Sequence, residues 1–138
     1  MPDTLISEAT RATAGVLLVT IVAVESGGLF MLQVVGRRMP ATSFQTAFFR
    51  AGHAHAGVLV TLALASQVYV DVAGLEGLFG SMARSGIALA AILMPAGFFL
   101  SAWGREVTRP NRLIALVYLG ALSLAAGALA LGLGLLLG

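Results

Sequence analysis

Four ionisable side chains lie within two apolar stretches of this chain: Glu25 in the first, and Arg50, His53 and His55 in the second. A carboxylate, a guanidinium and imidazoles can together hold a proton, a metal ion or a small ligand. Such groups cost free energy in hydrocarbon, and inside a membrane protein they are rare unless they serve a purpose. We therefore take Glu25, Arg50 and His53 as a candidate ligand or proton site.

The spacing of these residues also predicts that they lie near one another. If the two stretches are helices that turn back on each other near Met39 and Pro40, Glu25 lies beside Ala54, between the two histidines. Each then lies about 15–20 Å from the connecting loop, at 1.5 Å of rise per residue. This depth is close to the middle of a bilayer.

Helical phase separates the two histidines. Residues two apart on a helix point about 200° apart. His53 therefore shares a polar stripe with Arg50, whereas His55 lies on another side of the helix, on a weaker polar face with Ser66 and Tyr69.

The elements that would position these side chains are membrane helices. The chain has 138 residues, of which 59% are hydrophobic and 10% charged, far below the roughly 25% charged residues of a soluble domain. Four apolar stretches are long enough to cross a bilayer as helices, and none alternates as the strands of a membrane barrel do. We predict an all-α integral membrane four-helix transmembrane bundle as one domain over residues 1–138, with helices at about 12–36, 44–70, 85–103 and 111–137.

Arginine placement predicts the orientation. All eight basic residues are arginines, six of them near the loops after the first and third stretches and two, Arg11 and Arg84, on the other side. The positive-inside rule then places both termini on the non-cytoplasmic side. The absence of lysine, with abundant alanine, glycine and arginine, indicates a bacterial inner (plasma) membrane protein. The partners are the lipid bilayer and a homo-oligomer or larger membrane complex, and no basic face suited to nucleic acid can be drawn.

Several chemistries remain open for the intramembrane histidine and its neighbours. A Glu–His pair can relay a proton, or the same groups can simply neutralise and join helices. Haem is possible, although both histidines lie on one helix, so one chain offers one axial ligand and a dimer offers two. A divalent metal on His53 and Glu25 would need at least one further ligand.

Two partial resemblances widen the choice. A four-helix layout with Glu25 central in the first helix resembles the small multidrug resistance exporters, whose membrane glutamate binds a proton or a cationic drug in a dimer. The chain lacks the aromatic residues that line those exporters' pockets, and the resemblance leaves Arg50 and His53 unexplained.

The segment Phe48–His55 resembles the arginine-bearing second helix of the membrane glutathione-transferase and leukotriene-synthase family, which implies an enzyme with a cytoplasmic-side site. The asparagine and glutamate expected after the arginine are replaced, roughly at Ala54 and Gly57, so membership does not follow. Our leading hypothesis is proton-linked binding or transport of a small ligand by a protein that is not an enzyme. The alternatives are an accessory or haem- or metal-binding subunit, and then a small membrane enzyme.

Overall fold

The chain folds into long helices. The computed structural model describes residues 6–137, and no strand occurs among them. All four long helices are long and apolar enough to cross a membrane, which confirms the predicted all-helical bundle for the described residues. Residues 1–5 and 138, which the single-domain prediction includes, lie outside them. The helices are α1 (Glu8–Val35), α2 (Ser43–Val72), α3 (Gly77–Ser101) and α4 (Ala115–Leu137), with a short 3₁₀ turn, η1 (Arg112–Ile114), before α4.

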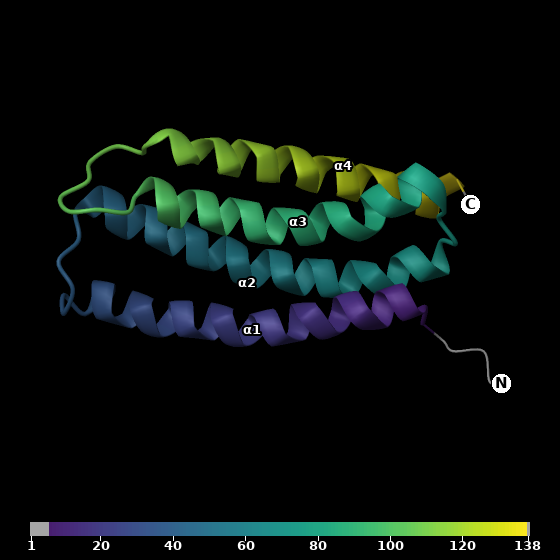
Figure 1. Ribbon diagram of the computed structural model, residues 1–138, viewed down its shortest axis with the longest axis horizontal. Coiled ribbons are helices and arrows are strands. Elements are labelled where there is room, and N and C mark those ends of the chain that lie inside the picture. Colours follow the sequence, from purple (N-terminus) through teal and green to yellow (C-terminus); the bar gives the residue numbers. More distant parts are fainter. Residues whose placement is uncertain (1–5, 138) are drawn as a thin grey trace.

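The helices lie side by side in chain order, as Figure 1 shows. Each packs mainly against its neighbours in sequence, so that α1 and α4 form the two edges of the row. Both termini lie at one end of the molecule, and the loops joining α1 to α2 and α3 to α4 lie at the other. Because α1 packs mainly against α2, the surface of α1 that faces away from α2 is exposed.

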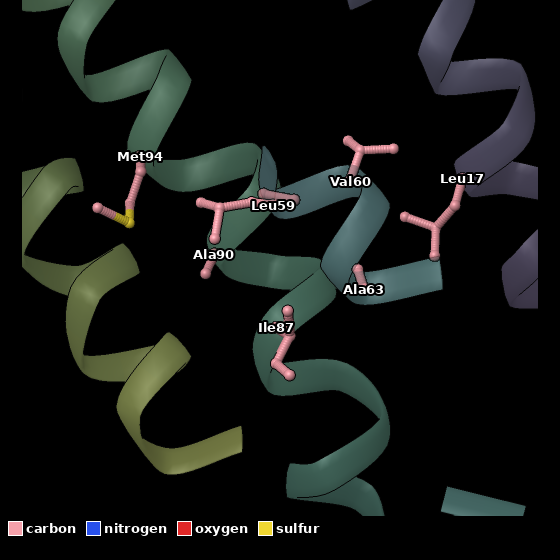
Figure 2. Packing of buried hydrophobic residues seen from close by; sticks show 8 residues of the cluster. Leu17, Leu59, Val60, Ala63, Ile87, Ala90 and Met94 are labelled. Carbon is pink, nitrogen blue, oxygen red and sulfur yellow. The ribbon is translucent and has the colours of Figure 1, made fainter. Parts of the chain in front are cut away.

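The largest core cluster joins α1, α2 and α3, and Val117 and Leu124 of α4 pack against it (Figure 2). Leu17 of α1 packs with Leu59, Val60 and Ala63 of α2. From α3 come Ile87, Ala90, Ala91 and Met94, all less than a tenth exposed. Small side chains such as Ala63 and Ala90 allow the helices to approach closely, which favours association in a membrane.

Two helix starts show how local sequence sets the boundaries. The sequence offers Thr42 or Ser43 as the cap of the second helix, and the structure has Thr42: its hydroxyl accepts from the Gln45 backbone N–H, and the Gln45 side chain accepts from the Thr42 N–H. The sequence predicts that the fourth helix opens with Pro110 in its first turn, but Asn111 caps η1 and Pro110 lies before this cap. Asparagine is among the best capping residues, so it fixes the start there.

The third helix begins at Gly77, eight residues before the predicted start at 85. The prediction left Ser81 and Arg84 in the connection before the third helix. In the structure they lie inside α3, and α2 continues through Asp71 to Val72, so the connection is only a short turn. The helix can include Arg84 because a partner, described below, neutralises its charge.

Glycines bring α3 and α4 into contact. Their seven-residue spacing in the sequence predicts a packing surface, within the bundle or between subunits, at Gly120, Gly127 and Gly134. Gly120 lies against Met94, and a Cβ built on Gly127 would lie 2.9 Å from the Cα of Gly86. The Ser123 hydroxyl also donates to the Gly86 carbonyl at 2.8 Å. Gly120 and Gly127 therefore pack against α3, and Gly134 lies against Leu75 in the turn before α3.

Candidate functional site

His53 lies at the seam between α1 and α2. It is half-buried, and a Cβ built on Gly27 or Gly28 of α1 would come within 3.4 Å of its ring. The two glycines thus form a notch that admits the imidazole, as close helix contacts with small residues allow. The predicted register of the hairpin is correct to within one or two residues, since Gly27 and Gly28 lie opposite His53 where the sequence had placed residue 26.

Glu25 and Arg50 lie on either side of this notch along the seam. Glu25 is three residues from Gly28, and Arg50 is three residues from His53, so each shares a helix side with its neighbour one turn away. Both side chains are exposed, whereas the sequence had placed them inside the bundle. Among the described residues neither makes an ion pair or a hydrogen bond.

We call the surface that carries Glu25, Arg50 and His53 the outer face. On α2 it continues as a shallow open groove of about 720 Å³. Its lining side chains are small or apolar apart from His53 and Thr61, and the Thr61 hydroxyl donates to the Gly57 carbonyl of its own helix at 2.9 Å. Arg50 and His53 lie one turn apart on α2 and Glu25 is exposed on the neighbouring α1; we call these three residues together the polar stripe, and none of them lines an enclosed cavity. Their role as a site stays a prediction.

His55 lies on a different side of α2. Its Nδ1 is 2.7 Å from the carbonyl oxygen of Ala51, and its ring lies over Phe98 of α3 with centroids 5.0 Å apart. The other members of the predicted second polar face do not join it. Ser66 is buried and donates to Ala63, and Tyr69 is exposed.

The most extensively bonded polar group lies elsewhere, at the end of the bundle that holds the termini. Arg84 of α3 donates from Nη2 to Asp71 Oδ1 at 2.9 Å and from Nη1 to the Thr10 hydroxyl. Asp71 also accepts from the amide and hydroxyl of Ser7, at 2.8 and 2.9 Å. We call these residues, together with Gln67, the terminal network.

Gln67 ties this network to the core. The side-chain amide nitrogen of Gln67 donates to the backbone carbonyl of Arg84 at 2.9 Å. The backbone carbonyl of Gln67 accepts from the Thr10 hydroxyl at 3.3 Å. The side chain is fully buried. The network therefore joins α1, α2 and α3 at one level of the bundle.

Sequence reasoning missed this network because it assigned Asp71 and Arg84 to a loop. The sequence does indicate the pairing through the opposite charges and the positions of the two residues. One acidic and one basic residue flank the turn between α2 and α3, thirteen residues apart. Asp71 is one residue from the end of α2 and Arg84 is seven residues into α3, so the long arginine side chain spans the difference in depth.

These features define a four-helix bundle whose helices are each long and apolar enough to cross a membrane, with exposed Glu25 and Arg50 side chains on two of them. Within residues 6–137 no group of three or more His, Cys, Asp or Glu side chains is placed to hold a metal ion. The chain matches no protein-family model, no curated protein and no solved structure.

Proposed function

We propose that this protein binds or transports a small ligand in a proton-linked manner, with Glu25, Arg50 and His53 as the site and a second copy of the chain completing it. The observation that carries the proposal is the exposure of Glu25 and Arg50 on helices that are long and apolar enough to cross a membrane. Left against lipid, each would cost several kcal/mol, roughly 2.5–3.5 on insertion scales for a charged residue at a helix centre.

The depth of the stripe supports an intramembrane role. His53 is ten residues from the start of α2, and Glu25 is ten residues from the end of α1. At 1.5 Å per residue each lies about 15 Å from the loop end, half of a hydrocarbon core of about 30 Å. Arg50 lies one turn nearer the loops, where its long side chain can reach the interface.

The residue types supply the chemistry. Glu25 can exchange a proton for a cation, and His53 can accept or pass on that proton. Arg50 supplies a fixed positive charge that favours an ionised Glu25 or an anionic group of the ligand. Facing copies of the stripe would enclose these groups and exclude lipid from them.

The orientation belongs to the same proposal. Arg37, Arg38 and Arg105 lie in the loops at the end opposite the termini, and Arg109 and Arg112 lie between α3 and α4. With Arg50, they make that end cytoplasmic by the positive-inside rule. Both termini then lie outside the cytoplasm, in a bacterial inner membrane.

Replacing Glu25 with glutamine should abolish proton movement without unfolding the protein, because glutamine keeps the shape but cannot release a proton. Reconstituted into vesicles containing pyranine, with a valinomycin-set potential, the wild-type protein should carry protons, and Glu25→Gln should lower the rate at least about tenfold. Glu8→Gln is the matched control, because Glu8 is exposed at the start of the same helix and pairs with the exposed Arg11. Equal rates for wild type and Glu25→Gln would refute a proton role for Glu25.

A second candidate, a haem- or metal-binding subunit, is favoured by the geometry of His55. If Nδ1–H donates to the Ala51 carbonyl, Nε2 keeps a free lone pair and the ring is fixed in orientation. Ligating histidines are commonly held in this way. The test is an absorption spectrum with metal analysis on protein purified in mild detergent. A Soret band or stoichiometric metal that His55→Ala removes would support this candidate, and a wild-type protein without either would exclude it.

A further inference from the structure

A second groove lies between α1 and α3, with α2 as its floor. Its volume is about 280 Å³. Its wall on α1 includes Val16 and Leu17, its floor is Val60, and its wall on α3 includes Ala88, Leu89 and Ile92. The groove is separate from the site proposed above, because its lining includes none of the residues Glu25, Arg50 and His53.

One end of the groove is polar. Arg84 lines it there, and the terminal network holds this side chain in place. A guanidinium has five N–H donors. The bonds to Asp71 and Thr10 use two of them, and the other three have no acceptor among the described residues. The side chain is 22% exposed, so an acceptor can approach it.

The charges at the polar end of the groove determine which kind of hydrogen-bond acceptor Arg84 can bind. The carboxylate of Asp71 lies 2.9 Å from the guanidinium and neutralises it. An anionic group would gain little there, whereas an uncharged carbonyl could accept a hydrogen bond without introducing a new charge.

The depth and the width of the groove between α1 and α3 determine what kind of molecule can occupy it. Arg84 is seven residues from the start of α3, about 10 Å along the helix, and Ile92 lies about 12 Å further in. A helix, 10–12 Å across with its side chains, is far too wide for such a space. A flexible hydrocarbon chain is the one component of the bilayer that fits both the apolar walls and the width.

We propose that this groove binds one acyl chain of a glycerophospholipid, whose ester carbonyl accepts a hydrogen bond from Arg84. The lipid would fill the gap between α1 and α3 and extend the terminal network into the interface.

Native mass spectrometry of the wild-type protein tests the proposal without any substitution. The protein is taken from vesicles with equal parts of dioleoyl phosphatidylcholine and its dialkyl ether analogue, which has no ester carbonyls. One phospholipid per chain should be retained, and the ester lipid should exceed the ether lipid about tenfold, the effect of one hydrogen bond to a charged donor. Equal retention of the two lipids, or no retained lipid, would overturn the proposal.

Two variants locate the site. Ala88→Phe should fill the groove and reduce lipid retention about tenfold or more, since the chain would lose most of its apolar contact area. The matched control is Ala121→Phe, which adds the same ring at an exposed position of α4 and should retain lipid as the wild type does. Retention by a folded Ala88→Phe protein at the wild-type level would show that the lipid binds elsewhere.

Discussion

Replacing Arg84 with leucine should lower the free energy of unfolding by about 3–5 kcal/mol, because it leaves the Asp71 carboxylate without its partner in a largely buried position. The Asp71 and Arg84 side chains are only 15% and 22% exposed, and the substitution also removes the donor to Thr10. Reversible denaturation in mixed micelles, followed by circular dichroism, measures the change.

The control for this prediction is Arg11→Leu. Arg11 pairs with Glu8 at 3.2 Å, but these side chains are 70% and 92% exposed, so solvent screens the pair and little stability should be lost. Replacing both Asp71 and Arg84 with leucine should restore much of what Arg84→Leu loses, because no unpaired charge remains. If Arg84→Leu cost no more than Arg11→Leu, the terminal network would not stabilise the fold.

Replacing Gly127 with leucine should force α3 and α4 apart. A Cβ at this position would meet the backbone of Gly86 and Ile87 at 2.9 Å, and backbone atoms cannot turn aside as a flexible side chain does. We expect a loss of about 3 kcal/mol, at the upper end of overpacking costs. The separation would also break the bond from Ser123 to the Gly86 carbonyl.

Gly132→Leu is the matched control on the same helix. A Cβ on Gly132 has nothing within 4 Å, so this variant should unfold close to the wild type. Similar denaturation midpoints for Gly127→Leu and Gly132→Leu would contradict the close approach of α3 and α4 at this point.

The sequence predicted four long apolar helices and the α1–α2 register well, because apolar length and loop position determine both. Once Met39 and Pro40 mark the turn, counting residues backward and forward brings Gly27 and Gly28 close to His53. The packing role of the α4 glycines could also be predicted, because small residues at seven-residue spacing lie on one side of a helix and allow another helix to approach closely.

The orientation of Glu25 could not be predicted in the same way. A soluble helix reveals its buried side through an apolar stripe, but a membrane helix is apolar all round, because lipid and protein interior are alike. The neighbours of Glu25 in α1 therefore gave no sign of which side faces α2. Phase could relate Arg50 to His53 on one helix, but it could not tell whether that side faced inward.

The pairing of Asp71 with Arg84 was hidden for a related reason. A charged residue near the edge of an apolar stretch usually ends the span, so Arg84 was placed before the third helix. Only the fold shows that Asp71 lies close enough to neutralise it, which lets α3 begin at Gly77.

The central claim is that a second copy covers the outer face, and disulfide crosslinking tests it most directly. The chain has no cysteine, so single cysteines can be introduced one at a time along α2 and oxidised in native membranes. We predict disulfide-linked dimers at exposed positions around His53, namely Ala54, Val58 and Ala65. Crosslinking at Ala128 on the exposed side of α4, with none at these three positions, would contradict the account, as would a protein that stays monomeric at all four.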